Sequence, residues 1–165
     1  MPNDQQDIEF QLATYFPYMV RIFYRDVSQT VKDVYTTIFG LSVSEWRTMS
    51  VLNDFEPLSA KEIVSRSSMD KVNVSRSISS LQRRKYLERH IDPADRRRVL
   101  LRLTRQGKQV MIELIPLVQE IERDLLKGLS AVERETLVKL MRKVSLNAHA
   151  IQPPTSDAQM KKVGT

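Results

Sequence analysis

The chain has 165 residues, 41% of them hydrophobic and 28% charged, with a formal net charge of +6. This length suits one domain with a real core, or two small lobes. The absence of cysteine excludes disulfides, thiolate catalysis and cysteine metal sites. No apolar run approaches the roughly 20 residues of a membrane span, and the polar, acidic residues 1–7 do not resemble a secretory signal. We therefore expect a globular, cytoplasmic protein.

The positive charge is concentrated in one segment. Residues 83–108 contain ten Lys or Arg and three acids, a net charge of +7, whereas the remaining 16 basic and 17 acidic residues give −1. A charge run is most often a solvated surface. Confinement of the whole excess to one segment nevertheless favours binding of nucleic acid.

The N-terminal part reads as one long helix. Apolar residues recur every three or four positions over 8–39, which predicts a helix whose stripe faces a core or a partner helix. Pro17 should kink or divide it, and Gly40 should end it.

Serine–glutamate capping boxes mark three further helix starts, at Ser42, Ser59 and Ser130. They predict helices over 42–54, 59–67 and 131–149. Asp70 should cap another helix over 70–85, and Thr104 one over 105–127 with a bend at Pro116.

Residues 87–103 alternate like a β-hairpin. Leu87 and Ile91 on one strand, and Val99, Leu101 and Leu103 on the other, should share the inward face. The turn over 92–97 forms the tip, and the polar tail Gln152–Thr165 should be disordered.

This order of elements predicts a mainly α fold with a small β-wing. It combines a winged helix-turn-helix DNA-binding lobe with a helical dimerisation lobe. We expect an N-terminal dimerisation region (1–40), the DNA-binding lobe (41–104), C-terminal dimerisation helices (105–150) and a tail (151–165).

The helix that starts at Lys71 is the expected recognition helix. In a helix-turn-helix the second helix enters the major groove. Burial of Val74, Ile78 and Leu81 would leave polar, basic and small side chains facing outward, and these suit contacts with base edges. They are Lys71, Val72, Asn73, Ser75, Arg76 and Ser79. The alternative is an ordinary surface helix.

The hairpin tip carries Arg96, Arg97 and Arg98. A narrow minor groove attracts inserted arginine, so one of them should enter it while its neighbours contact phosphates. Asp95 should brace an arginine. Ser59 and Lys61, at a helix N-terminus, are further candidates for phosphate contact.

Five segments together resemble the MarR family of transcription regulators. They are Gly40–Trp46, Leu58–Ile63, Val74–Leu81, Asp95–Thr104 with Gly107, and Leu129–Arg134. The resemblance implies a homodimer joined through the first and last two helices, a palindromic operator, and often a small effector between the lobes. It gives Arg76 the recognition-helix role and Arg97 the wing-tip role, and we expect a repressor.

One position departs from the family. Glycine usually precedes the first wing strand, where this chain has Lys85-Tyr86. A left-handed conformation costs a non-glycine residue roughly 1–2 kcal/mol. Either the turn differs or the strain is tolerated, so replacing Lys85 by glycine should be neutral or stabilising.

An effector pocket is a weaker expectation. The lack of cysteine excludes a thiol peroxide sensor, and two histidines do not suggest a zinc sensor, so we expect no metal and no cofactor. Arg21, Tyr24, Trp46 and Met49 could line a site for an aromatic carboxylate. Plain core packing explains Trp46 and Met49 equally well.

Two other classes of function were considered. Catalysis has little support, because the chain has four glycines, no glycine-rich phosphate loop, no histidine cluster and no paired carboxylates. A DNA-binding protein without sequence specificity, or an architectural one, remains the alternative to a sequence-specific regulator.

Overall fold

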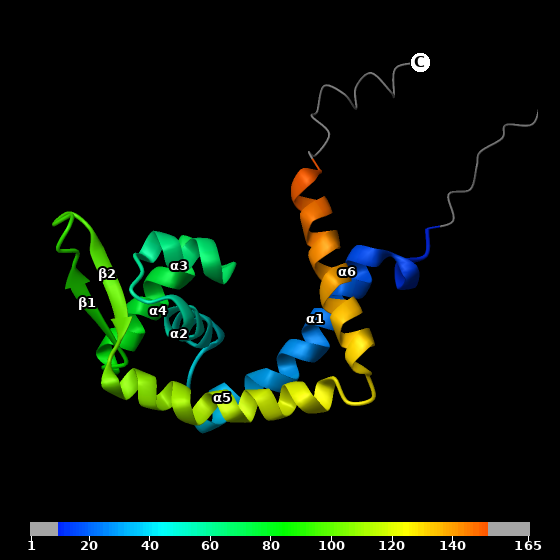
Figure 1. The fold of residues 1–165 in the computed structure, drawn as a ribbon, viewed down its shortest axis with the longest axis horizontal. Coiled ribbons are helices and arrows are strands. Elements are labelled where there is room, and N and C mark those ends of the chain that lie inside the picture. The colour runs from blue at the N-terminus through cyan, green and yellow to red at the C-terminus, as the bar shows by residue number, and fades with distance from the viewer. Residues whose placement is uncertain (1–9, 152–165) are drawn as a thin grey trace, which may run out of the picture. The chain divides into compact units, whose positions relative to one another are not determined.

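The computed structural model describes residues 10–151, so the tail that should be disordered lies outside the described residues. The chain divides into two compact units, one ending at Leu125 and the other beginning at Leu126 (Figure 1). The described part is mainly helical with a small two-stranded antiparallel sheet, which confirms the predicted fold class. No helix within residues 10–151 combines the length and apolar character needed to cross a bilayer.

The N-terminal arm consists of three pieces instead of one helix. They are a 3-10 turn η1 (Leu12–Thr14), the helix α1 (Phe16–Asp33) and a π-helical turn η2 (Val34–Ile38). Pro17 stands in the first turn of α1, where its missing N–H costs no hydrogen bond. Of the two predicted outcomes, a kink or a division at Pro17, the structure shows the division, because the proline stands at the start of α1. Gly40 ends the arm as expected, with a φ of +60°.

The next three helices belong to the winged helix-turn-helix lobe, and the last two of them are the helix-turn-helix itself. The three helices are α2 (Val43–Phe55), α3 (Ala60–Ser67) and α4 (Lys71–Arg83). Ser42 and Ser59 close the capping boxes of α2 and α3, and Asp70 accepts the Asn73 N–H at 2.8 Å to cap α4. The helix starts predicted from these local side chains are confirmed.

The hydrophobic core of the first unit lies between these helices, the hairpin and α5 (Arg105–Leu125). Met49, Leu52, Ile63, Leu81 and Leu114 are completely buried in it. Thr104 caps α5 by accepting the Gly107 N–H at 3.0 Å, and the helix continues through Pro116.

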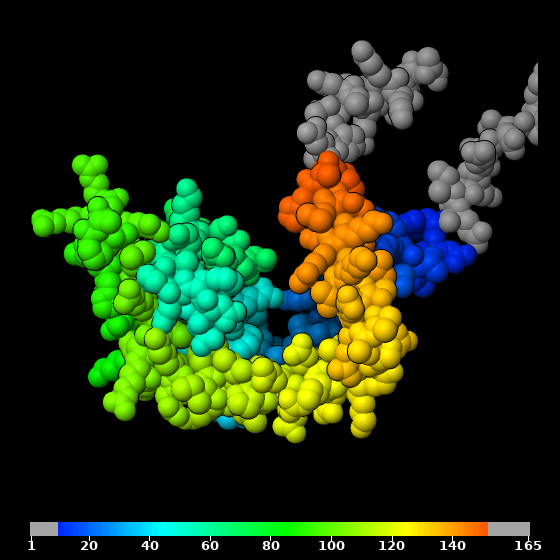
Figure 2. Space-filling model, viewed as in Figure 1, coloured from blue at the N-terminus to red at the C-terminus, as the bar shows by residue number. Residues whose placement is uncertain are grey.

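The hairpin consists of β1 (Leu87–Ile91) and β2 (Val99–Leu103), paired from Leu87 opposite Leu103 to Ile91 opposite Val99. Leu58 adds a short antiparallel bridge to Leu101. The inward face is confirmed at the base of the hairpin, but Ile91 and Val99 are 66% and 44% exposed. The outer half is not buried because the tip projects beyond the helices (Figure 2).

Glycine is absent from one turn and required nearby. Lys85 follows α4 with a φ of +58°, so the strained form of this turn is the one adopted. Tyr86 N–H bonds to Leu81 O at 2.9 Å and Lys85 N–H to Gln82 O at 3.0 Å, the pattern of a left-handed helix end. A Cβ on Gly107 would lie 2.1 Å from the Tyr86 carbonyl oxygen, so α5 can pack under this turn only with glycine at that position.

The second unit contains α6 (Ala131–Ala150), capped by the third box at Ser130. Within the described chain no residue of α6 is buried. Its apolar side chains Val138, Leu140, Met141 and Val144 are 42–54% exposed.

Candidate nucleic-acid interface

One face of α4 is buried and the other is open. Val74, Ser77, Ile78 and Leu81 face inward, and the Ser77 hydroxyl shares a buried 2.7 Å hydrogen bond with Thr48 on α2. This bond fixes the rotation of α4 about its axis. The six residues predicted to face outward are all exposed: Lys71, Val72, Asn73, Ser75, Arg76 and Ser79.

The start of α4 holds one of these side chains in place. Asp70 accepts the backbone N–H of Asn73 at 2.8 Å and its side-chain Nδ2 at 2.6 Å. These two hydrogen bonds lower the pKa of Asp70. The Asn73 amide is therefore oriented before any ligand arrives, with its Oδ1 and one N–H available.

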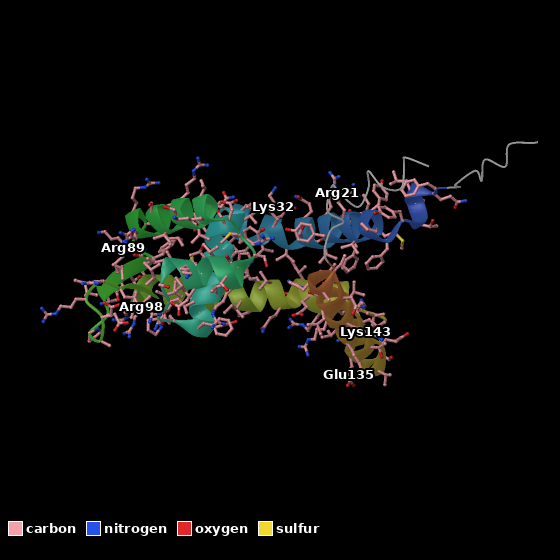
Figure 3. The ribbon with its side chains drawn as sticks, turned by 90° about the horizontal axis from the view of Figure 1, so that it is seen from above. Arg21, Lys32, Arg89, Arg98, Glu135 and Lys143 are labelled. Atoms are coloured by element: carbon pink, nitrogen blue, oxygen red, sulfur yellow. The ribbon has the colours of Figure 1, made fainter. Side chains whose placement is uncertain are left out.

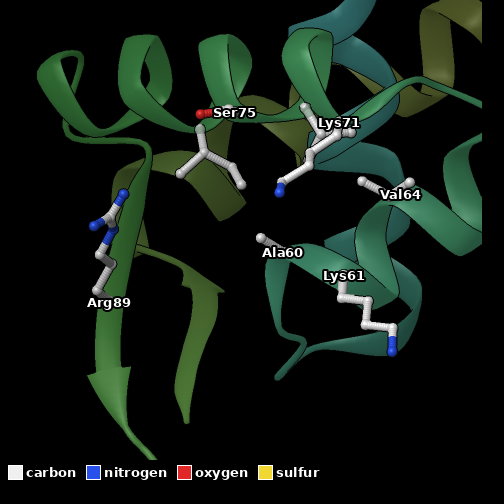
Figure 4. A pocket seen from close by; sticks show the side chains of 8 residues that line it. Ala60, Lys61, Val64, Lys71, Ser75 and Arg89 are labelled. Carbon is white, nitrogen blue, oxygen red and sulfur yellow. The ribbon is translucent and has the colours of Figure 1, made fainter. Parts of the chain in front are cut away.

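A cleft lies between α3, α4 and β1, along one flank of α4 (Figure 4). Its volume is about 390 Å³ and its floor is largely apolar. The cations Lys61, Lys71 and Arg89 line it, and no acid does. Arg89 was not singled out from the sequence, because its position on a strand beside the recognition helix is a tertiary feature.

A second cleft, of about 490 Å³, lies along the opposite flank of α4, where α2 begins. Six serines line it, of which Ser75 also lines the first cleft. The other lining residues are Glu45, Arg76 and Arg83. Burial opposes ionisation of Glu45, but hydrogen bonds from Ser42 and Ser80 outweigh it and lower the pKa of the carboxyl. The first cleft has lysine and arginine side chains and the second has Arg76 and Arg83, so both flanks of the exposed face of α4 carry cations.

The hairpin tip is closed by its own hydrogen bonds. Asp92 Oδ1 accepts the Ala94 N–H at 2.9 Å, and Asp95 Oδ1 accepts the Arg97 N–H at 3.0 Å. Asp95 was expected to brace an arginine, and it does so through the backbone N–H of Arg97. The side chains of Arg96 and Arg97 are exposed and make no hydrogen bond or ion pair with any other residue of 10–151.

Arg98, which is labelled in Figure 3, differs from its two neighbours because its side chain has partners. Its Nη2 lies 2.8–2.9 Å from both carboxylate oxygens of Glu62, and its Nη1 lies 3.7 Å from Asp92. The hydrogen bond to Glu62 raises the pKa of Arg98. Arg98 therefore ties the hairpin to α3.

Glu62 is also the residue that closes the cap of α3. It accepts the Ser59 N–H at 2.8 Å and the Ser59 hydroxyl at 2.6 Å. The Ser59 hydrogen bonds, with Arg98, lower the pKa of Glu62 to about 2. Of the two predicted phosphate contacts at this helix start, the Ser59 hydroxyl is already engaged and Lys61 is exposed.

The four residues predicted to hold an aromatic acid do not converge. Arg21 and Tyr24 are exposed on α1, Trp46 stacks on Tyr35 at 5.7 Å, and Met49 is completely buried in the core. Burial raises the pKa of Tyr35. Arg47, which the sequence did not single out, donates from Nη2 to the Tyr24 hydroxyl. The structure therefore brings Tyr24 together with Arg47.

The amino-acid sequence is similar to those of known transcription regulators. A model of the MarR family matches residues 39–98, from the end of the arm to the hairpin tip. The HTH-type transcriptional regulator YwaE of Bacillus subtilis is 29% identical over 129 residues, 76% of this chain and 75% of YwaE. The HTH-type transcriptional repressor NicR of Pseudomonas putida is 28% identical over 104 residues, 63% of this chain and 66% of NicR.

Solved structures agree with the sequence matches. BpsR of Bordetella bronchiseptica, whose DNA binding is regulated by 6-hydroxynicotinic acid, is 27% identical with a TM-score of 0.74, over 82% of this chain and 96% of BpsR. PcaV of Streptomyces coelicolor, solved with its natural ligand, is 26% identical with a TM-score of 0.69, over 84% and 97%. These proteins are transcription regulators and not enzymes. Over residues 39–98 this chain is therefore similar to the winged helix-turn-helix transcription regulators of the MarR family.

Proposed function

We propose that this chain is a repressor that binds a palindromic DNA operator as a homodimer, with α4 in the major groove. The observation that carries the proposal is the open face of α4 between two clefts that both carry cations. The major groove is bordered by two phosphate backbones, and a helix lying in it meets one on each flank. Cations on both flanks are suited to those backbones.

The residues at the centre of the α4 face would read bases. Arg76 can donate two hydrogen bonds to guanine, Asn73 can pair with adenine, and Val72 can contact a thymine methyl group. Val72 is 56% exposed, so its methyl groups are accessible to a base. Lys71, Ser75 and Ser79 complete the surface that would enter the groove.

The three arginines of the hairpin would divide their roles. Arg96 and Arg97 are free to contact DNA, Arg97 in the minor groove and Arg96 at a phosphate. Arg98, with Ser59, would act through Glu62 by holding the hairpin against α3. Lys61, beside this anchor, remains a candidate for phosphate contact.

The dimer would be formed by the arm and the C-terminal helices. Residues 1–40 and 105–150 would form the dimerisation parts and residues 41–104 the DNA-binding lobe. On α1 alone, Phe16, Met19, Val20 and Phe23 are 45–54% exposed. Such an apolar row on a surface helix is suited to a second copy of the chain.

Mutation of the interface tests this function. Arg76→Ala should lower discrimination between the operator and random DNA by roughly 1–3 kcal/mol, because base-specific hydrogen bonds are lost. Arg96→Ala should weaken binding to every sequence and reduce the slope of log affinity against log salt by about 1. Both are measured by fluorescence anisotropy on a duplex selected from a random library by the wild-type protein.

Arg123→Ala is the matched control, because Arg123 is exposed at the far end of α5. It should leave affinity and salt slope unchanged. If the wild-type protein selects no sequence and binds all duplexes with similar affinity, the protein is a non-specific or architectural DNA binder and the proposed function is wrong.

The relatives support an aromatic acid as effector. BpsR responds to 6-hydroxynicotinic acid, and in this chain the Tyr24–Arg47 pair offers a hydroxyl and a guanidinium side by side. We place the effector at this pair and expect it to weaken operator binding. Titration of heteroaromatic and phenolic acids into the operator complex tests this idea, with Arg47→Met as the variant that should lose the response.

A further inference from the structure

Arg84 connects the end of α4 with the end of the N-terminal arm. It follows the last residue of α4, and its side chain is 28% exposed. Its Nη1 donates to the Gly40 carbonyl at 2.9 Å, and its Nη2 donates to the Phe39 carbonyl at 2.8 Å. The guanidinium also stacks over the Tyr86 ring at 4.7 Å. One side chain thus joins segments that lie 44 and 45 residues away.

The two carbonyls belong to the turn that ends the arm. The π-helical turn η2 stops at Ile38, and Gly40 then adopts a left-handed conformation. Carbonyl groups at a helix C-terminus lack intrahelical partners and carry partial negative charge, so a cation is favoured there. A planar guanidinium can reach two adjacent carbonyls at once, which a lysine ammonium cannot do in the same geometry.

Glu45, in the first turn of α2, also lies close to Arg84. Its side chain is nearly buried, with one oxygen accepting the Ser42 N–H at 2.7 Å and the other 3.9 Å from Arg84 Nη1. A further hydrogen bond links Glu45 to Ser80 on α4. The arm, α2 and α4 therefore meet at one arginine, which we name the Arg84 joint (Phe39, Gly40, Glu45, Arg84 and Tyr86).

Arg84 does not belong to the DNA-contacting surface. It lines neither of the two clefts that flank α4. Its neighbour Arg83 lines the serine-rich cleft and is exposed, and its side chain has no hydrogen-bond or ion-pair partner among residues 10–151. Two consecutive arginines are thus directed to different tasks by their positions on the helix.

We infer that the Arg84 joint sets the angle between the arm and the recognition helix, and thereby the half-site spacing that the dimer accepts. The inference rests on the proposed dimeric operator binding. If the arm is the dimer-forming element, a rotation at the joint is applied to both recognition helices by the symmetry of the dimer. Because half-site separation must match the separation of the two recognition helices, Arg84 acts as a positioning residue for DNA binding.

The test compares the affinity of each variant for DNA with one half-site and for DNA with two half-sites. The probes are a synthetic duplex carrying the inverted repeat selected by the wild-type protein, the same duplex with the half-sites moved by one or two base pairs, and a duplex with a single half-site. The variants are Arg84→Met, which removes the bonds to both carbonyls, and Arg84→Lys, which keeps the charge. Arg83→Met is the matched control.

For Arg84→Met we expect half-site affinity within about twofold of wild type, but a loss of roughly tenfold or more on the full operator, since one half-site is misplaced. The preference for the native spacing should flatten, and Arg84→Lys should behave likewise. Arg83→Met should weaken all duplexes by a similar factor and keep the spacing preference.

An equal loss on half-site and full operator, or no loss on either, would overturn the inference. If Arg84→Met does not fold, as judged by its thermal melt, Arg84→Lys decides by the same criteria. A wild-type protein without sequence preference would instead contradict the proposed function itself.

Discussion

At the scale of single residues, Lys85 shows the clearest conflict between side chain and backbone. Its φ of +58° is a conformation that glycine adopts without cost, whereas other residues lose roughly 1–2 kcal/mol there. A glycine at this position would lower the free energy of unfolding by about 0.4–1 kcal/mol, because it increases the conformational entropy of the unfolded chain. The Lys85→Gly variant should therefore have the same free energy of unfolding as wild type, or one that is higher by up to about 1 kcal/mol. Denaturant titration measures this difference.

The control for this variant is Gln119→Gly, at an exposed right-handed position inside α5. That substitution should cost about 1 kcal/mol. A clear loss of stability in Lys85→Gly, comparable to the control, would mean that the lysine side chain contributes contacts that outweigh the backbone strain.

At the scale of elements, the contact between α3 and the hairpin depends on the charge of Glu62. Its pKa is about 2 in the folded protein and 4.5 for the free group. A lowered folded pKa gives stability that is fully present above pH 4.5 and is lost as the pH falls towards 2. Glu62→Gln should thus destabilise the protein at pH 6 and lose its effect near pH 2. The side chain is 39% exposed, so we expect only about 1 kcal/mol.

Glu133→Gln is the matched control, because Glu133 closes the same kind of box at the start of α6 without an arginine partner among residues 10–151. Chemical denaturation at several pH values measures both variants. A Glu62→Gln effect at pH 6 no larger than that of Glu133→Gln would show that Arg98 adds nothing to the cap. A variant with a loosened hairpin should also lose the affinity contributed by Arg97.

At the scale of the whole molecule, we expect the apolar side chains that are exposed on α1 and α6 to be buried in the proposed dimer. Introducing a charge among them should cost roughly 3–5 kcal/mol of dimer stability, because it would be buried without a partner. We expect sedimentation to give a dimer for wild type and a largely dissociated chain for Met141→Glu. Lys139→Glu, two residues away and on the opposite side of the helix, should leave the dimer intact. A wild-type monomer at all concentrations would refute the proposed dimer.

The sequence identified the elements correctly where the signal is local. The serines at 42, 59 and 130 and Asp70 bond to groups three residues away, and these helix starts are confirmed. The exposed face of α4 followed from its 3.6-residue period. The sequence failed where an outcome depends on what surrounds an element: Ile91 is exposed because the hairpin extends beyond the core.

The arginines illustrate the division most clearly. Composition and spacing determined a winged helix-turn-helix whose excess positive charge lies between the end of the recognition helix and the start of the next helix, because periodicity, caps and charge runs are properties of neighbouring residues. Only the tertiary structure decided what each arginine does. Arg98 meets Glu62 across 36 residues and Arg84 meets Gly40 across 44, while the side chains of Arg96 and Arg97 have no partner within residues 10–151. A long, flexible cation can satisfy either a distant carboxylate or a ligand, and the choice is made only by the groups that folding places within its reach.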